Sequence, residues 1–211
     1  MQEWHPAIAA NRKNFKVKKG QAIFNEGDEV KGIFFVYEGL VKVHKRWGEE
    51  KELIIRFAQE GAIFGHRVLG GNLIYPISAT ALSDSVICFI DNKFFESTLK
   101  VNTDFTYKLM LFFASELQEA ERKMRNLAHM SVKGRIAQAL ISLEEQFGSK
   151  EDHSINLELS RQDLASYAGA TYETVFRVLT ELLKEGIIIT SGRKITINDR
   201  VKLLELTTEH A

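Results

Sequence analysis

The sequence contains little cysteine or proline, has no net charge, and has no hydrophobic run long enough to cross a membrane. Its 211 residues include one cysteine and two prolines, and 28 Lys and Arg balance 28 Asp and Glu. One cysteine, Cys88, excludes an intrachain disulfide and an iron–sulfur cluster held by several cysteines. No apolar stretch reaches the roughly 20 residues of a membrane-spanning helix, and no signal peptide opens the chain. We therefore expect a cytoplasmic protein with no membrane partner.

Motifs that indicate an enzyme are also missing. The sequence has no nucleophile with its base, no phosphate-binding glycine loop, and no His-x-His followed by Glu that would mark a metal-binding β-barrel enzyme. The expectation is a protein without catalytic residues and without a metal site. Cys88 lies in the apolar run 86–90, where a buried structural thiol is more common than a reactive one.

The sequence does contain enough apolar residues for folded cores. Hydrophobic residues make up 45% of the chain and aromatic residues 10%, and the length suits two small domains. The zero net charge gives no sign of a polyanionic partner. From residue 131 onward acidic residues outnumber basic ones, which argues against nucleic-acid binding, but the placement of individual cations matters more than their sum.

Residues 160–184 have the pattern of two helices joined by a short turn. Ser160, followed three residues later by Asp163, is a capping pattern in which side chains satisfy the free amides of a first helical turn. Gly169 breaks the first helix, because glycine adopts left-handed backbone angles at least cost, and Thr171 can cap the second. Helix, glycine turn and helix form the helix-turn-helix arrangement.

A β-hairpin is expected directly after the second helix. Gly186 ends that helix, and two strand-forming runs, 187–190 and 194–197, flank the turn 191–193. A hairpin in this position is a wing, so the segment is predicted to be a winged helix-turn-helix. The alternative is a helix pair and hairpin that serve only for packing.

The second helix is expected to have one buried and one outward face. Its three- and four-residue spacing predicts a buried stripe of Val175, Val178, Leu179, Leu182 and Leu183. The outward face carries Glu173 and Arg177, one turn apart, together with Tyr172 and Phe176. A carboxylate and a guanidinium at this spacing suit cytosine N4 and guanine O6/N7 in a major groove, which favours DNA binding over a packing role.

Three stretches of the sequence, residues 134–140, 159–164 and 170–179, resemble the Crp/Fnr family of bacterial transcription regulators. The resemblance implies a regulator that binds double-stranded DNA and works with RNA polymerase. By the same resemblance, Glu173 and Arg177 read a TGA-containing inverted repeat.

Two positions of the second helix depart from the family pattern. Tyr172 stands where the family often has arginine, and Phe176 where it has a small residue, so Phe176 is expected against a thymine methyl group. The residues expected to contact phosphates, which position the protein without reading sequence, are Ser160, Arg161, Gln162 and Thr171.

The N-terminal segment, residues 1–101, is expected to form an antiparallel β-roll within an α+β protein. Short apolar runs separated by glycines are typical of a barrel or roll, and they recur at 22–24, 33–37, 40–44, 53–57, 77–81 and 86–90. The segment resembles the cyclic-nucleotide-binding domain that begins Crp/Fnr proteins, with Gly39 and residues 61–65 at recognisable places.

The positions that hold cyclic AMP in the family carry other residues here. The resemblance implies a glutamate after Gly65 and an Arg-Ser pair farther along, where this chain has His66 and Tyr75-Pro76. The Thr-Ser pair that meets adenine is replaced by Ala120 and Glu121. These replacements argue against cyclic AMP and leave an unknown small-molecule effector, with Arg67 available to an anion. The candidate pocket comprises Gly65, His66, Arg67, Tyr75, Ala120 and Glu121.

Haem is left open as a cofactor by this reasoning. It needs an axial ligand, for which His44, His66 and His129 are the candidates. A lone histidine is more often a surface or packing residue than a ligand.

Residues 102–131 are expected to form a dimerisation helix and a hinge, followed by the DNA-binding domain, residues 132–211. Leu109, Leu111 and Phe112 are expected to pack on the β-roll near the helix start. Beyond Ala114 the helix has no second apolar stripe, so its seam predicts a homodimer. That seam, at alternating steps of three and four, consists of Met110, Phe113, Leu117, Ala120, Met124 and Leu127.

The sequence is compatible with two functions from different classes. The first is a homodimeric DNA-binding transcription regulator of the Crp/Fnr type whose effector is not cyclic AMP. The second is a β-roll module that senses haem, nitric oxide or another small molecule, with a helix-turn-helix used only for packing or protein interaction. The outward pairing of Glu173 and Arg177 favours the first.

Overall fold

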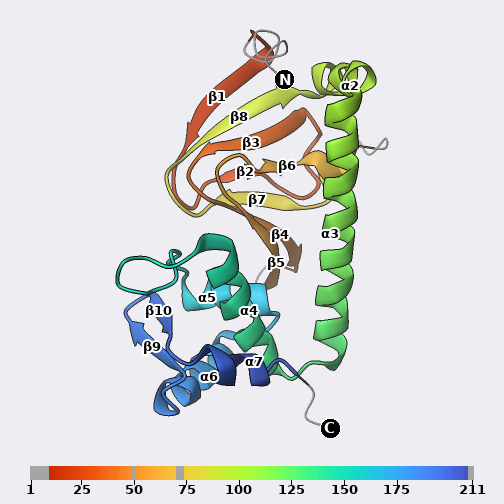
Figure 1. Ribbon diagram of the computed structural model, residues 1–211. Helices are drawn as coiled ribbons and strands as arrows, with labels where there is room; N and C mark the ends of the chain where they lie inside the picture. The colour runs from red at the N-terminus through yellow and green to blue at the C-terminus, as the bar shows by residue number, and fades with distance from the viewer. Residues whose placement is uncertain (1–9, 49–50, 70–73, 209–211) are drawn as a thin grey trace. The chain divides into compact units, whose positions relative to one another are not determined.

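The computed structural model divides the chain into two compact units, Met1–Ala114 and Ser115–Ala211. It describes residues 10–48, 51–69 and 74–208. The boundary falls inside one long helix, α3 (Thr103–His129), which confirms the helix expected there. The expected α+β class is also confirmed: a β-roll comes first, then α3, then a winged helix-turn-helix (Figure 1). The limits 1–101, 102–131 and 132–211 remain predictions.

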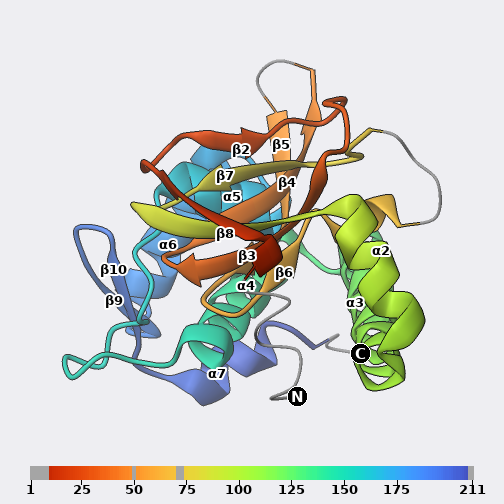
Figure 2. The same cartoon turned by 90° about the horizontal axis from the view of Figure 1, so that it is seen from above.

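The first unit contains two four-stranded antiparallel sheets (Figure 2). One has the order β1-β8-β3-β6 and consists of β1 (Arg12–Val17), β8 (Ser85–Asp91), β3 (Gly32–Glu38) and β6 (Ile63–Phe64). The other has the order β2-β7-β4-β5 and consists of β2 (Ala22–Phe24), β7 (Ser78–Ala81), β4 (Val41–Trp47) and β5 (Lys51–Ala58). The turn between β3 and β4 needs glycine, because Gly39 has φ +100° and a Cβ there would overlap the side chain of Ser85.

Strand β1 was not expected from the sequence. Five of its six residues are exposed, and only Val17 is buried. It is an edge strand that pairs with β8 alone, from Arg12 opposite Ile90 to Val17 opposite Ser85. Its lysines and arginine mask the strand pattern, and charged side chains of this kind are how natural sheets protect an edge.

The core of the β-roll is rich in aromatic rings. Phe24, Phe34, Phe64 and Tyr75 are buried together, and the rings of Phe24 and Tyr75 stack with centroids 4.0 Å apart. The hydroxyl of Tyr75 donates to the carbonyl oxygen of Gly32 over 2.7 Å, so its polar end is satisfied inside the fold. Asp91 caps helix α2 (Asn92–Val101), which follows β8.

The first turns of α3 pack against this core, but not through all the expected residues. Leu109 is buried, and Phe112 and Phe113 are partly buried against the core cluster. Leu111 is 51% exposed, so the expectation that it packs on the β-roll is wrong. Phe113 packs there instead. Phe112 and Phe113 lie three and four residues after Leu109, so all three side chains are on the same face of the helix.

The second unit forms the winged helix-turn-helix around a second hydrophobic core. After the end of α3 come α4 (Val132–Phe147), α5 (Arg161–Ala168), α6 (Tyr172–Lys184), β9 (Ile188–Ser191), β10 (Lys194–Ile197) and α7 (Arg200–Glu205). The expected caps are confirmed: Ser160 accepts from the amide of Asp163, Gly169 is left-handed with φ +63°, and Thr171 accepts from the amide of Thr174. Strands β9 and β10 pair as the expected wing.

No helix in the described part of the chain combines the length and the apolar character that a membrane crossing requires.

Candidate nucleic-acid interface

Helix α6 presents a polar and aromatic face to solvent. Its residues Tyr172, Glu173, Phe176 and Arg177 are all exposed, and the Phe176 side chain is 60% exposed. The opposite face is buried through Val175, Val178, Leu179 and Leu182. Leu183 is 44% exposed, so its assignment to the buried stripe is wrong. It follows the fully buried Leu182, and one step along a helix turns a side chain by roughly 100° away from the core.

Glu173 and Arg177 lie at the centre of this exposed face. They are four residues apart and therefore occupy neighbouring positions on the helix surface. Within residues 10–48, 51–69 and 74–208, neither side chain makes a hydrogen bond or an ion pair. The carboxylate keeps its acceptor sites and the guanidinium keeps its five donors for an external partner. This part of the surface can recognise hydrogen-bonding groups of both kinds.

The hydroxyl groups of Ser160 and Thr171 are used inside the protein. Oγ of Ser160 accepts from the amide of Asp163 over 2.9 Å, and Oγ1 of Thr171 accepts from the amide of Thr174 over 3.3 Å. Both residues therefore serve as helix caps, and their contact with phosphates remains a prediction. Gln162 is exposed on the first turn of α5.

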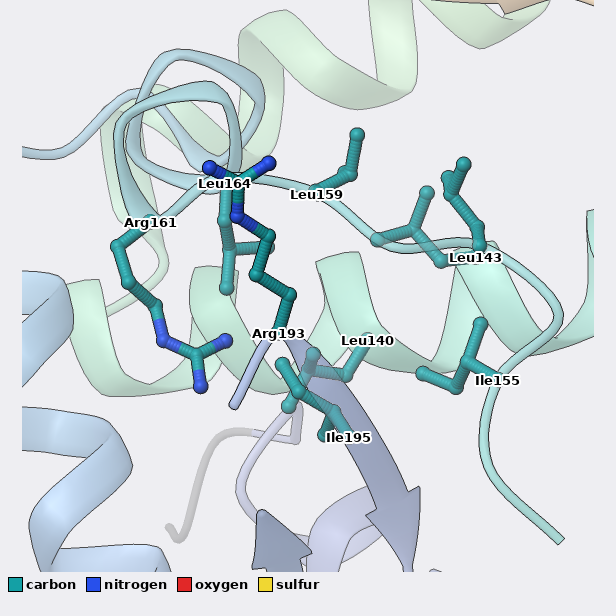
Figure 3. Close-up of a pocket in the computed structure, with 9 residues that line it drawn as sticks. Leu140, Leu143, Ile155, Leu159, Arg161, Leu164, Arg193 and Ile195 are labelled. Carbon is teal, nitrogen blue, oxygen red and sulfur yellow. The ribbon is translucent and has the colours of Figure 1, made fainter. Parts of the chain in front are cut away.

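Arg161 is tied to the wing. Its Nη2 donates to the carbonyl oxygen of Gly192 over 3.1 Å, and burial lowers the pKa of its guanidinium. Figure 3 shows Arg161 and Arg193 beside the apolar side chains that line a small cavity of about 10 Å³ where α4, α5 and the wing meet. The position of Arg161 at the start of a helix indicated a phosphate contact. Its hydrogen bond to Gly192, 31 residues away, could not be predicted from the sequence.

Arg193 is a further candidate contact, to which the sequence analysis assigned no role. It is exposed in the turn of the wing and has no hydrogen bond or ion pair to any described residue. Its neighbour Lys194 is committed to Asp152, with Nζ 2.6 Å from Oδ2, and this partner holds the pKa of Asp152 below its usual range. The sequence signal for this contact was the presence of a cation in the turn of the predicted wing.

In the β-roll, His66 is enclosed beside α3. Its side chain is 1% exposed, and neither ring nitrogen has a hydrogen-bond partner among the described residues. Its ring meets the rings of Phe112 and Phe113 edge-on, each with centroids 5.1 Å apart. Burial, followed by the positive charges of Arg56 and Arg67, lowers the pKa of His66 to about 3. The imidazole is therefore neutral in the folded protein at ordinary pH.

The candidate effector pocket is brought together only in part. Gly65 is left-handed with φ +77°, and a Cβ there would contact the rings of Phe34, Phe24 and Tyr75. Tyr75 instead lines an open cavity of about 390 Å³ with Phe24, Phe34, Asp28 and other residues, among which His66 and Arg67 are not found. Ala120 and Glu121 lie beyond the boundary between the units, so their place in a pocket remains a prediction.

These residues do not fit a cyclic nucleotide. A neutral, enclosed His66 offers no carboxylate to a ribose, and the hydroxyl of Tyr75 is already bonded to Gly32.

His44, a candidate haem ligand, is also buried. Its Nδ1 lies 3.0 Å from Oε2 of Glu52 and its Nε2 lies 2.9 Å from Oγ1 of Thr80, so both ring nitrogens face protein groups. His44, with Lys42, lowers the pKa of Glu52 to about 2. His129 is exposed at the end of α3.

Two family models match the chain over most of its length. Residues 14–102 match the cyclic nucleotide-binding domain, and residues 134–206 match the Crp-like helix-turn-helix domain. Among curated proteins, the chain is 30% identical over 189 residues to an anaerobic regulatory protein of Bacillus subtilis, covering 88% of this chain and 79% of that protein. It is 27% identical to the fumarate and nitrate reduction regulatory protein of Yersinia pestis, covering 90% and 76%.

Solved structures show the same architecture. FixK2 from Bradyrhizobium japonicum is 26% identical with a TM-score of 0.83, covering 95% of this chain and 99% of that one. A CRP/FNR family transcriptional regulator from Thermus thermophilus is also 26% identical, with a TM-score of 0.77 and coverage of 94% and 100%. With both domain models matched in order and the fold shared throughout, this chain belongs to the Crp/Fnr family of transcription regulators.

Proposed function

We propose that the protein is a homodimer that reads a TGA-containing inverted DNA repeat through α6. The observation that carries this proposal is the pair of Glu173 and Arg177, exposed one turn apart on α6 and without partners among the described residues. A carboxylate accepts from cytosine N4, and a guanidinium donates two hydrogen bonds to guanine O6 and N7. Both side chains stand at the family's motif positions, which imply a guanine and cytosine of the TGA half-site.

Exposed apolar residues of α3 support the homodimer. Met110, Leu117, Met124 and Leu127 are between 42% and 64% exposed and repeat along one side of the helix. A single chain leaves this stripe in water, whereas the same stripe of a second copy buries it. In a dimer, two recognition helices about 34 Å apart enter successive major grooves, which explains an inverted repeat as the target. RNA polymerase is the further partner expected of such a regulator.

The state of the β-roll supports an effector other than cyclic AMP. His66 and Tyr75 replace the residues that hold the nucleotide in the family, and both are packed into the fold. The same replacements are compatible with a dimer that binds DNA without any nucleotide. The proposal therefore includes DNA binding by the purified protein in the absence of cyclic AMP.

Selection of bound DNA from a random duplex pool tests this function. The purified, ligand-free protein is expected to enrich an inverted repeat with TGA in each half, and added cyclic AMP is expected to leave the enrichment unchanged. The Arg177→Ala variant, selected in parallel, should lose the preference for the guanine in each half-site. If no sequence is enriched and no duplex is retarded even at low salt, the proposal fails and the sensing module with a packing helix-turn-helix is favoured.

A further inference from the structure

The first turn of α4 holds the backbone on both sides of the segment that leads into the recognition helix. The guanidinium of Arg135 donates three hydrogen bonds: Nη1 to the carbonyl of Met130 over 2.9 Å, Nε to Ala168 over 3.1 Å, and Nη2 to Gly169 over 3.1 Å. Met130 lies between the end of α3 and the start of α4, within the segment 102–131 for which a hinge is expected. Ala168 and Gly169 end α5 just before Thr171, the N-cap of α6.

These three bonds suit arginine and not lysine. Carbonyls at a helix end lack partners within the helix, and a cation that binds them also complements the negative end of the helix dipole. A planar guanidinium directs several donors along fixed directions, so it can bind the hinge carbonyl and the two turn carbonyls at once. A lysine ammonium keeps the charge but not this geometry.

The same turn also reaches the other end of the recognition helix. Nζ of Lys133 lies 3.1 Å from Oε1 of Glu185 and 3.6 Å from Oε2 of Glu181, in the last turn and C-cap of α6. The side chains of all three residues are partly exposed, so this pair orients the helix end more than it stabilises the fold. Arg135 therefore holds the turn before α6, and Lys133 holds the C-terminal end of α6.

Gly134, between these two residues, allows a third close contact. A Cβ at Gly134 would lie 2.6 Å from the carbonyl oxygen of Leu206 and 2.9 Å from Cγ of Met130. The chain that follows α7 therefore packs directly on the turn that carries the two cations. Three consecutive residues thus join the hinge, the recognition helix and the C-terminal segment.

We propose that Arg135 and Lys133 are positioning residues that fix the turn before α6 and the C-terminal end of α6 to the first turn of α4, so that the orientation of the recognition helix follows the hinge at residues 130–131. This inference rests on the proposed DNA-binding function. Neither side chain is assigned a contact with DNA. Their effect is on the angle at which Glu173 and Arg177 are presented, and hence on the distance between the two half-sites that a dimer can read.

The test uses the full-length protein and three duplexes: the selected repeat, the same repeat with one base pair added between the halves, and an unrelated sequence. Arg135→Lys and Lys133→Glu are expected to weaken binding to the selected repeat about tenfold. Loss of a contact between two neighbouring residues of a protein typically has an effect of this size. Binding to the unrelated duplex should change little. The penalty for the added base pair, large in the wild type, should shrink in both variants.

Two further variants separate positioning from a general loss of structure. Lys133→Glu combined with Glu185→Lys restores the ion pair with its charges exchanged and should recover the spacing penalty. Lys150→Glu breaks a comparable surface pair, Lys150 with Glu158 at 3.0 Å, and should leave all three affinities unchanged. If Arg135→Lys does not fold, as judged by circular dichroism, the Lys133 and Glu185 variants carry the test.

The outcomes for the two proposals are distinct. Wild-type protein that prefers no duplex contradicts the proposed function itself. Wild-type protein that reads the repeat, together with variants that keep the wild-type preference and the wild-type spacing penalty, overturns the positioning role and leaves the regulator intact. Equal weakening on all three duplexes also overturns it, because that pattern indicates loss of folded protein.

Discussion

Arg161 and Gly192 are joined by a hydrogen bond in which Nη2 of the arginine donates to the glycine carbonyl oxygen over 3.1 Å. The contact links the first residue of α5 to the turn of the wing. It gives Arg161 a structural partner inside the domain, in addition to the phosphate contact that its position at a helix start suggests. The wing and the helix-turn-helix are therefore held as one surface.

Replacing Arg161 is expected to weaken binding to all DNA alike. Arg161→Ala removes a cation near the DNA and frees the wing, so the salt dependence of binding should become shallower by about one phosphate contact. Hydrogen exchange at the wing amides should become faster. Arg193→Ala is the matched control, because it should also flatten the salt slope but leave wing exchange unchanged. Loss of binding to the selected repeat alone would contradict this role.

Replacing Arg177 is expected to act on sequence recognition instead. Arg177→Ala should cost about 1–3 kcal/mol in binding to the selected repeat, because a bidentate contact to guanine is lost. Retardation assays on the selected repeat and on a repeat with that guanine replaced measure the effect. The variant should bind both duplexes equally. If it still distinguishes them as the wild type does, the assignment of Arg177 is wrong.

Placing a charge on the apolar stripe of α3 is expected to separate the dimer. Leu117→Glu would bring two carboxylates together at a seam position, whereas Gln118→Glu adds the same charge on an exposed neighbouring face. Sedimentation velocity should show a monomer for the first variant and a dimer for the second. A wild-type protein that sediments as a monomer would contradict the seam altogether.

His66 is expected to make stability depend on pH in a defined window. Its pKa of about 3 in the folded protein lies below the ordinary histidine value of 6.5, so the unfolded chain binds the proton more tightly. Its contribution to stability is complete above about pH 6.5 and is lost as the pH falls, by up to about 1.4 kcal/mol per pH unit. Glu52, with its pKa lowered to about 2, adds a loss only below about pH 4.5.

Denaturant unfolding between pH 5 and 7 at fixed protein concentration measures this effect. His66→Leu should remove most of the slope in that range, and His129→Gln, which changes an exposed histidine, should keep it. A wild-type free energy of unfolding that does not fall between pH 6.5 and pH 5 would contradict the buried neutral state of His66.

Local signals in the sequence predict the helix-turn-helix well. Ser160, Gly169 and Thr171 act within a few residues of themselves, through caps and a left-handed turn, so their spacing is sufficient to place α5 and α6. The outward position of Glu173 and Arg177 follows from the helical repeat alone. These positions depend on no partner from elsewhere in the chain.

Contacts between distant segments could not be predicted in the same way. Arg135 and Arg161 bind backbone carbonyls, which every residue has, so no side-chain pattern marks their partners. Phe113 packs on the β-roll and Leu111 does not, because two adjacent faces of α3 are apolar near its start and spacing alone does not say which face meets the β-roll. Strand β1 was missed because an exposed edge strand needs no alternating apolar residues.

Phe113 lies beside His66 and also at a position of the predicted dimer seam. Its ring packs against His66 and the β-roll core, while its position in the helix repeat places it in the predicted seam. If the seam includes it, association of two chains and the state of His66 share one side chain. Thermodynamic reciprocity then applies: for a compound that displaces His66 at two equivalent, independent sites, saturation changes the dimer dissociation constant by the square of the ratio between its per-site affinities for dimer and monomer. In the proposed dimer, binding of an effector at His66 is therefore expected to shift the oligomeric state, which a dilution series measures without any DNA.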